Sequence, residues 1–302
     1  MALPAGTWNV LACPACGAGV SAIGVDVCCR ACDIEYGRAP HGALDLRLRR
    51  PKRCRLTVDV GTPLLPDGGF DFAPLRMNPE PAVDFSATDA PHHLTRELMS
   101  FFPKAPAPHS LALDIGCGDA IHRGVCERAG FDYIGLDYDA PQAPMLADAH
   151  ALPFRDESFD FVLSIAVLEH IRFPLLMMRE AHRVLKPGGK FIGTVAFLEP
   201  FHGDSYYHHT HLGTFNALKH GGFEVEKIAP SADWTALRAQ ASMSLFPKMP
   251  RMFSSALVWP TEILHRLWWS AASLVSPKAD ALTRIRSTTG AFSFVASRRE
   301  NP

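Results

Sequence analysis

Two apolar runs, each containing or ending in an aspartate, mark the most regular part of the chain. The first, LALDI at residues 111–115, leads into a Gly-x-Gly turn and then into an amphipathic stretch at residues 120–129. A strand, a tight turn and a helix account for this order. The second run, residues 133–136, ends in Asp137 about 20 residues after the turn. The pattern therefore predicts the beginning of a nucleotide-binding βα unit.

Further runs of apolar residues predict more elements. Alternation predicts strands at residues 159–164, 190–196, 223–228 and 291–297, and helical spacing predicts helices at residues 91–102 and 212–220. Between Asp137 and Leu146, Pro141 and Pro144 leave little room for a crossover helix. We expect a turn there. Residues 61–91 are rich in proline and predict an extended linker.

The glycine turn suggests how a ligand is held. Gly116 and Gly118 have no Cβ, so a ligand can lie against the backbone where the strand ends. Asp114 can reach an ammonium group, and Asp137 can accept hydrogen bonds from ribose hydroxyls. The turn lacks the third glycine that a pyrophosphate-binding loop requires. Taken alone, the two glycines also fit a plain turn.

Several short motifs follow in a characteristic order. They are DIGCG at residues 114–118, LD at 136–137, LADA at 146–149, LPF at 152–154, SFDFVLS at 158–164, VLEH at 167–170 and LKPGGK at 185–190. This order resembles the class I S-adenosylmethionine-dependent methyltransferases, in the broad type 11-like group of small-molecule and lipid-quinone methylases. The resemblance covers residues 111–230. It implies an α/β, Rossmann-like fold with a seven-stranded sheet and the cofactor S-adenosylmethionine across the carboxyl ends of the strands.

The same resemblance implies which residues contact the cofactor. Asp114, Gly116, Cys117 and Gly118 would border its methionine part, Asp137 and Tyr138 its ribose, Asp148 and Ala149 its adenine, and Ser164 and Ile165 its sulfonium. We interpret Glu169 and His170 as part of the family scaffold.

Composition limits the remaining choices. The chain has 302 residues, of which 47% are hydrophobic and 20% charged, and its net charge is -1. Such a chain can bury a large core and has no overall bias toward nucleic acid. No cationic start precedes a long apolar run, and no uncharged stretch reaches the ~20 apolar residues that span a bilayer. We expect a cytoplasmic protein, with peripheral contact to the inner face of a membrane as an alternative.

Two C-x-x-C pairs near the start predict a metal site. Cys13 and Cys16 form the first pair, and Cys29 and Cys32 form the second after twelve intervening residues. Four thiolates can surround one Zn²⁺ tetrahedrally, and such a site is structural because no coordination position is open. Cys28 lacks the two-residue spacing to Cys32. Ordinary buried or redox-active cysteines are the alternative.

The segment around these cysteines has a resemblance of its own. CPACG, the second C-x-x-C pair and IEYGRAPHGALDL at residues 34–46 resemble the zinc-ribbon proteins that activate some RNA and protein methyltransferases, and the zinc-bearing N-termini of certain ribosomal-RNA guanine methylases. Gly37 and Arg38 replace the Pro-Val expected after the tyrosine. The basic run RLRRPKRCR follows at residues 47–55 and is either a phosphate contact or a solvated linker.

The loop after the strand at residues 190–196 is the expected acceptor side. Parallel sheets bind substrates at the carboxyl ends of their strands. A base is needed when the acceptor is a hydroxyl or a protonated amine, and histidine suits that role. We therefore predict that Tyr207, His208 and His209 are catalytic. A packed helix entry capped by Thr210, or a metal site that includes His202, are the alternatives.

An insertion separates the last two predicted strands. Residues 231–289 hold four of the five tryptophans and seven basic against three acidic residues. An amphipathic helix is expected to begin at Pro260 and to end before Pro277. This insertion fits a membrane surface, a lid over an apolar pocket, or packing on the core or a second subunit. It favours a bulky or lipid-linked acceptor.

We therefore expect five segments. They are a zinc ribbon at 1–50, a linker and N-terminal helix at 51–108, the methyltransferase core at 109–230, a helical insertion at 231–289, and the last core strand and tail at 290–302. The expected function is in-line methyl transfer to a small or lipid-linked acceptor. The alternatives are an RNA base methyltransferase that holds RNA with its zinc ribbon, and a scaffold without catalysis.

Overall fold

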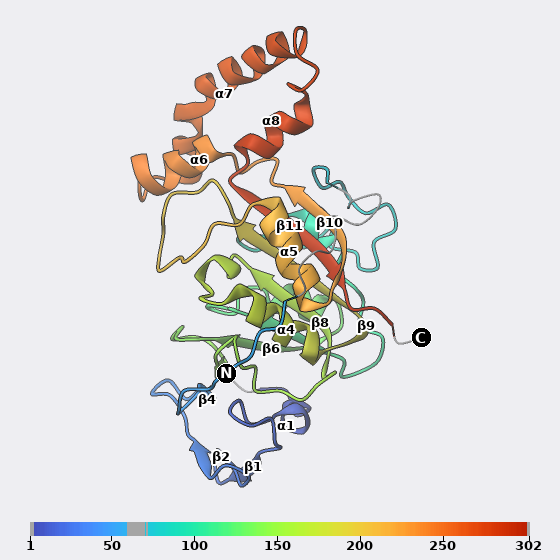
Figure 1. Ribbon diagram of the computed structural model, residues 1–302, viewed down its shortest axis with the longest axis vertical. Coiled ribbons are helices and arrows are strands. Elements are labelled where there is room, and N and C mark those ends of the chain that lie inside the picture. Colours follow the sequence, from blue (N-terminus) through green and yellow to red (C-terminus); the bar gives the residue numbers. More distant parts are fainter. Residues whose placement is uncertain (1–2, 59–69, 71, 301–302) are drawn as a thin grey trace.

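A central sheet organises the computed structural model, which describes residues 3–58, 70 and 72–300 (Figure 1). Its eight strands have the order β10-β11-β9-β8-β5-β6-β7-β4. These strands are β4 (Leu44–Asp45), β5 (Leu111–Ile115), β6 (Asp132–Asp137), β7 (Met145–Leu146), β8 (Phe159–Ile165), β9 (Leu185–Ala196), β10 (Glu224–Pro230) and β11 (Ala291–Ser297). β11 runs antiparallel to both β9 and β10, and the other pairs are parallel. The fold is α/β and Rossmann-like, as predicted.

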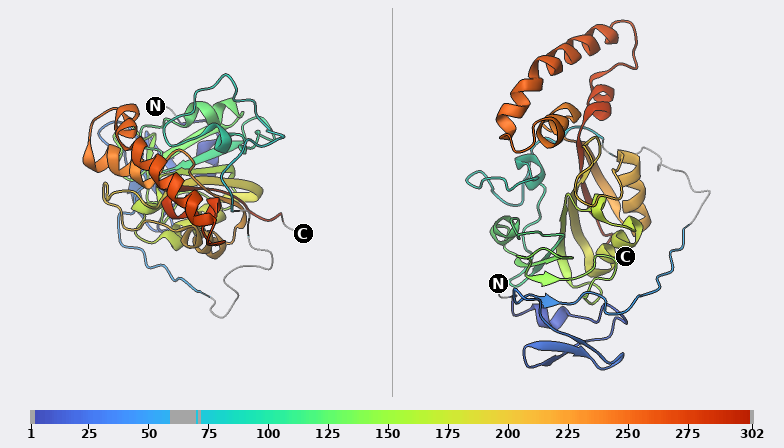
Figure 2. Two further views of the ribbon diagram at one scale, coloured as in Figure 1. Left: turned by 90° about the horizontal axis from the view of Figure 1, so that it is seen from above. Right: turned by 90° about the vertical axis from the view of Figure 1, so that its left-hand side faces the viewer.

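Helices cover both faces of this sheet (Figure 2). α4 (Pro174–Val184) and α5 (His211–Gly221) lie on one face, and α2 (Arg96–Met99) and α3 (Arg123–Arg128) lie on the other. Alternate residues of β5 separate the two cores: Leu113 packs with the α4 and α5 side, and Ala112 packs with the α2 and α3 side. This alternation explains why a buried strand carries apolar residues at almost every position.

The eighth strand was not expected from the resemblance, which implies seven. β4 pairs with β7 through Leu44 and Asp45, and the next residue, Leu46, donates its N–H to the carbonyl of Leu146 at 2.8 Å. Leu44 and Leu46 are fully buried. The apolar residues around Asp45 thus cover an edge of the sheet that would otherwise leave backbone groups unpaired.

A small sheet precedes β4. It consists of β1 (Ser21–Ile23), β2 (Asp26–Cys29) and β3 (Ile34–Tyr36) in antiparallel order, and α1 (Thr7–Val10) comes before it. In Figure 1 this sheet lies at one end of the molecule, opposite the helical arm formed by the segment between β10 and β11.

The helical arm replaces the expected single helix. It contains α6 (Ala236–Gln240), the π-helix η2 (Ala241–Leu245), α7 (Arg251–Ser273) and α8 (Ala281–Thr288). α7 begins nine residues before Pro260, which lies inside the helix, so the predicted start was wrong. Proline removes a single intrahelical hydrogen bond, and the preceding turns of α7 continue through it. In the described part of the chain, no helix is long and apolar enough to cross a membrane.

The predicted helix at residues 91–102 is shorter than expected. α2 covers four residues, with Thr95 as its N-cap. No helix lies between β6 and β7, in agreement with the prediction from Pro141 and Pro144. Part of the expected linker falls on residues 59–69 and 71, outside the described residues, and residues 72–91 contain no helix or strand.

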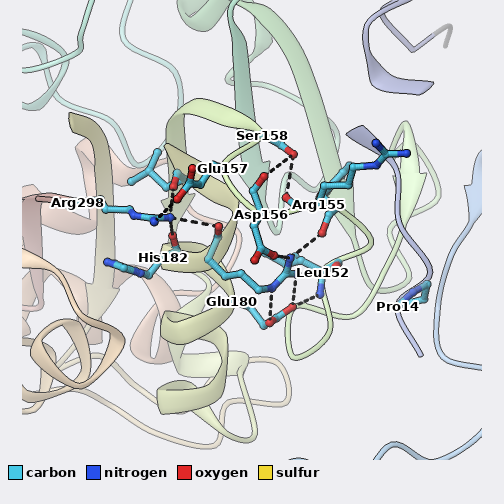
Figure 3. Close-up of polar contacts among 12 residues, drawn as sticks. Pro14, Leu152, Arg155, Asp156, Glu157, Ser158, Glu180, His182 and Arg298 are labelled. Atoms are coloured by element: carbon cyan, nitrogen blue, oxygen red, sulfur yellow. Dashed lines mark hydrogen bonds and ion pairs between the residues drawn. The ribbon is translucent and has the colours of Figure 1, made fainter. Parts of the chain in front are cut away.

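A polar network fixes the loop between β7 and β8 (Figure 3). Glu180 of α4 accepts the N–H of Leu152 at 2.8 Å, and Arg183 donates to the Leu152 carbonyl at 3.1 Å. Arg298, which follows β11, donates to the carbonyl of His182 at 3.1 Å. The network therefore holds the last strand, α4 and this loop together, and the residues just before Leu152 line the cleft described next.

Candidate functional site

A deep cleft opens at the carboxyl ends of β5, β6 and β8. Its volume is about 980 Å³. Gly116 follows β5, Asp137 ends β6, and Ala166 and Val167 follow β8, and all four residues line the cleft. β5 pairs with β6 on one side and with β8 on the other, so the order of the strands along the sheet reverses at β5. Open parallel sheets bind ligands at this switch point.

The glycine turn has the conformation that glycine permits. Gly116 has a φ of +73° and Gly118 a φ of +50°. The N–H groups of Gly116 and Cys117 both donate to the carbonyl of Leu136 at 2.9 Å, and that of Gly118 donates to Asp137 Oδ2 at 3.0 Å. These bonds tie the turn to β6. A Cβ at Gly116 would lie 2.4 Å from a methyl group of Val167.

Asp114 lies beneath the cleft and does not line it. Its carboxylate is fully buried, and Oδ2 accepts the hydroxyl proton of Tyr133 at 2.7 Å and faces His122 Nδ1 at 3.2 Å. Oδ1 is buried and has no hydrogen-bond partner among the residues that the structure describes. A donor such as an ammonium group would satisfy this oxygen, but Asp114 is not among the residues that line the cleft.

His122 shares its protons with two acceptors. Nδ1 faces Asp114, and Nε2 lies 3.3 Å from the carbonyl of His92. Burial lowers the pKa of His122, but the hydrogen bond and the charge of Asp114 raise it more, so the pKa lies above its ordinary value. The protonated imidazolium, which donates from both nitrogens, suits this environment.

The predicted ribose and adenine contacts line the cleft. Asp137 Oδ1 accepts the N–H groups of Asp139 and Ala140, both at 3.3 Å, and Tyr138 lies exposed beside it. Asp148 and Ala149 lie farther along the same wall. The outer wall of this half of the cleft is therefore acidic.

His150 fixes the orientation of Asp148. The Asp148 carboxylate accepts from His150 N at 2.9 Å and from His150 Nδ1 at 2.6 Å. His150 Nε2 accepts the N–H of Phe173 at 3.0 Å, so the ring proton belongs on Nδ1. Burial raises the pKa of Asp148, but the hydrogen bonds from His150 lower it further, below its ordinary value. No sequence pattern predicted a role for this histidine.

Four other predicted cofactor residues do not line the cleft. Cys117, Ser164 and Ile165 are buried, and Gly118 is also not among the lining residues. Ala166 and Val167, one and two residues beyond Ile165, line it in their place. The side chains that reach the cleft are therefore the immediate neighbours of the predicted residues.

The basic run lies along the mouth of the cleft. Leu48, Lys52, Cys54 and Leu56 contribute to the lining. Arg47 and Arg49, within the same run, both pair with Asp45, at 2.9 and 3.2 Å, and Lys52 donates to the carbonyl of Pro14 at 2.7 Å. These contacts hold the run against the protein. They give no support to an RNA-binding role for Arg47 and Arg49.

The acceptor loop contributes Gly203, Asp204 and Tyr206 to the cleft. His170, from η1 (Leu168–His170), lies beside them. The predicted catalytic residues Tyr207, His208 and His209 follow directly but are not among the lining residues.

The three predicted catalytic side chains have other surroundings. The Tyr207 hydroxyl donates to the carbonyl of Arg172 at 3.4 Å. Nε2 of His208 and Nε2 of His209 are buried without a partner in the described part of the chain. Burial also lowers the pKa of His209. Thr210 accepts the N–H of Gly213 at 3.0 Å and caps α5, as the helix-entry alternative requires.

The structure brings the four predicted cysteines together. The sulfur atoms of Cys13, Cys16, Cys29 and Cys32 all lie within 4.8 Å of one another, with pairs at 3.5 and 3.6 Å. Four sulfurs at the usual Zn–S distance of ~2.3 Å are separated by ~3.8 Å in a tetrahedron. The donor set and the spacing therefore fit a structural zinc ion, and Cys28 does not belong to the cluster.

Comparisons with known proteins agree with this geometry. Residues 113–193 match the family described as "Methyltransferase domain". A methyltransferase-family protein of Encephalitozoon cuniculi is 38% identical over 126 residues, which cover 39% of this chain and 59% of the relative. The ubiquinone biosynthesis O-methyltransferase of Roseobacter denitrificans is 31% identical over 138 residues, which cover 41% of this chain and 54% of the relative.

Among solved structures, a complex of the Haloferax volcanii Trm112 methyltransferase activator with a methyltransferase aligns with a TM-score of 0.46 and 19% identity, over 68% of this chain and 88% of that one. This chain thus spans 54% to 59% of the length of the two curated relatives. The glycine turn and the acidic cleft wall lie within residues 113–193, the part of the chain that matches a methyltransferase domain.

Proposed function

We propose that the protein transfers the methyl group of S-adenosylmethionine to a small or lipid-linked acceptor. The observation that carries this proposal is one continuous cleft of about 980 Å³, with the glycine turn on one side and the acceptor loop on the other. A volume at the upper end of the range for small-molecule sites leaves space for a second molecule beside the cofactor.

Each cofactor contact follows from the position of a side chain. Asp137 would accept from the ribose, and Asp148 and Ala149 would face the adenine, while the negative charge of Asp114 beneath the cleft would favour the ammonium end. Methyl transfer is an in-line displacement, in which the sulfonium loses its charge as the C–S bond breaks. Alignment of the acceptor with the methyl group therefore supplies much of the rate. We assign the alignment to the acceptor loop, where Tyr207, His208 and His209 lie next to the cleft-lining Tyr206.

The helical arm supports an acceptor that resides in a membrane. The side of α7 that faces the protein includes Ser254, Glu262 and His265 together with Val258 and Trp269, and most large side chains on the exposed side are apolar. Large exposed residues on the helix and just after it are Met252, Phe253, Leu257, Trp259, Ile263, Leu264, Leu267, Trp268, Leu274 and Val275. Glu262 is buried because it pairs with Arg238 at 3.0 Å. The helix therefore exposes a large apolar surface to solvent, as does a helix that lies in a membrane surface.

The positive charge of the helical arm favours an anionic lipid surface over a second copy of the chain as its binding partner. The segment at residues 231–289 has seven basic and three acidic residues. Two of the acidic residues are engaged within the arm, Glu262 with Arg238 and Asp280 as the N-cap of α8. Two such arms would repel one another, while acidic lipid headgroups would attract each of them.

Calorimetric titration with S-adenosylhomocysteine tests the enzyme, and vesicle sedimentation tests the acceptor class. Micromolar binding of the nucleoside is expected. Phosphatidylglycerol vesicles should bind the protein, and phosphatidylcholine vesicles should bind it less. Leu264→Glu should weaken vesicle binding about tenfold or more, because a buried leucine contributes ~1.5–3 kcal/mol.

Thr261→Glu is the matched control, because Thr261 is an exposed polar residue on the same helix. It should weaken binding less than Leu264→Glu does. Equal binding to both lipids, or dimerisation without vesicle binding, would contradict the membrane proposal. Binding of total RNA in place of vesicles would favour a nucleic-acid acceptor. Absence of nucleoside binding would leave a scaffold role.

We further propose that Cys13, Cys16, Cys29 and Cys32 hold a structural zinc ion. A four-thiolate site leaves no position for a substrate, so the ion would stabilise the small sheet β1–β3 and take no part in methyl transfer.

A further inference from the structure

A second group of potential metal ligands borders the cleft. Glu169, His170 and His202 each offer a ligand atom, and these three atoms lie within 4.8 Å of one another. Glu169 and His170 belong to η1, and His202 comes from the acceptor loop after β9. His170 also lines the cleft. Two segments far apart in the sequence thus bring an N/O donor set to the wall of the proposed acceptor site.

Glu169 has the arrangement expected of a ligand without its cation. The residue is fully buried, and neither carboxylate oxygen has a hydrogen-bond partner within the described residues. A buried carboxylate without a partner is costly, and a cation is one of the few groups that remove this cost. The carbonyl of Glu169 accepts the N–H groups of Tyr206 at 2.7 Å and Tyr207 at 3.2 Å, so the backbone here is firmly held.

Hydrogen bonding determines which ring nitrogen of His202 carries the proton. Its Nδ1 lies 3.0 Å from the carbonyl of Pro200 and 3.8 Å from Glu199 Oε2, both of which are acceptors. The ring proton therefore belongs on Nδ1, which leaves the lone pair of Nε2 free. Metal-binding histidines usually donate their second N–H to a carbonyl or a carboxylate in this way.

We propose that Glu169, His170 and His202 bind a divalent transition-metal cation of the zinc class. Two imidazoles and one carboxylate form a set that Zn²⁺ and similar ions accept, and three protein ligands leave a position for water or an acceptor oxygen. A cation at this wall would lower the pKa of an acceptor hydroxyl bound to it. The metal site is a separate proposal from methyl transfer. Metal binding can be measured without an acceptor.

Metal content after equilibration with Zn²⁺ tests the assignment in the full-length protein. The wild type should retain two equivalents, one in the four-cysteine cluster and one in the Glu169 site. Glu169→Gln and, independently, His202→Gln should each retain one equivalent. His109→Gln, which alters a histidine with an 84% exposed side chain, should retain two.

Co²⁺ substitution separates the two sites. Cobalt bound to thiolates absorbs strongly through sulfur-to-metal charge transfer, and cobalt bound to nitrogen and oxygen does not. Glu169→Gln should remove the second equivalent without changing the thiolate band, while Cys16→Ser should weaken that band. One equivalent in the wild type, or equal contents in the wild type and both ligand variants, would overturn the assignment. Binding of S-adenosylhomocysteine is measured in the same samples, so a failure of the metal site is distinct from a failure of the proposed enzyme.

Discussion

Replacement of Gly116 by alanine tests the packing that shapes the floor of the cleft. Gly116 and Val167 both line it. A Cβ at Gly116 would lie 2.4 and 2.7 Å from the two methyl carbons of Val167, and the φ of +73° is unfavourable for any residue with a side chain. The substitution therefore combines two independent penalties, backbone strain and overpacking.

The structure provides a way to separate these penalties. A left-handed conformation costs ~1–2 kcal/mol for a residue with a Cβ. Overpacking in a dense core adds ~1–3 kcal/mol. At Gly118, φ is +50° but no atom lies within 4 Å of an added Cβ, so Gly118→Ala should incur the first penalty alone. We expect Gly116→Ala to reduce the free energy of unfolding by ~2–5 kcal/mol and Gly118→Ala by ~1–2 kcal/mol.

Urea unfolding followed by circular dichroism measures these differences, and Val167→Ala completes a double-mutant cycle. Removal of the two Val167 methyl groups relieves the two closest contacts and leaves only the Cβ of residue 167, at 3.1 Å from the new Cβ. In that background the cost of Gly116→Ala should fall toward the cost of Gly118→Ala. An unchanged cost in the Val167→Ala background, or equal costs for the two glycine variants in the wild type, would refute the reasoning.

Three further predictions concern charged and metal-binding groups. Because Asp114 raises the pKa of His122, folding should lose stability as the pH rises above about 6.5 toward that raised pKa, and His122→Gln should flatten this dependence in urea titrations. Glu262→Ala should destabilise the arm by up to about 3 kcal/mol, less than for a fully buried pair because the Arg238 side chain is 24% exposed. Faster proteolysis within residues 231–289 would report this loss, and an unchanged rate would contradict it. Cys16→Ser should release zinc and expose the small sheet to proteolysis, whereas Cys28→Ser should do neither.

The sequence predicted the core because its periodicity and its motifs agree. Residues 111–115 and 159–164 read as strands, and β5 and β8 occupy those positions. The glycine turn between β5 and α3 needs a left-handed backbone, which Gly116 supplies. Local pattern and final fold therefore coincide where the backbone itself shapes the cleft.

Prediction was weaker where a side chain could point in either of two directions. Asp114 precedes the glycine turn, yet its carboxylate packs beneath the cleft with Tyr133. In the acceptor loop no periodicity fixes which residue faces the ligand, so Tyr206 lines the cleft while the prediction chose the next three residues. His150 reaches the cleft from a turn whose position depends on β7 and α4, and no local signal identifies such a contact.

The amphipathic character of α7 was also predictable, but its orientation was not. A sequence defines two faces of a helix without stating which one meets the protein. Glu262 lies on the protein-facing side because it pairs with Arg238 at 3.0 Å and accepts the hydroxyl proton of Thr235. These partners hold the inner side of α7 against the protein, and most of its large apolar residues then face solvent. Composition alone does not predict which residues of the helix are exposed.

The base of the helical arm contacts the acceptor loop. The proposed membrane-binding arm and the proposed metal site are therefore linked through side chains. Trp234, at the start of the arm, donates its indole N–H to Glu199 Oε1 at 2.6 Å. The guanidinium of Arg251, at the start of α7, lies 4.4 Å above the same indole ring. Glu199 in turn lies 3.8 Å from His202. A membrane that fixed α7 would therefore act, through Trp234, on the loop that carries a proposed metal ligand. The arm would then position the acceptor side relative to the lipid surface as well as bind the lipid.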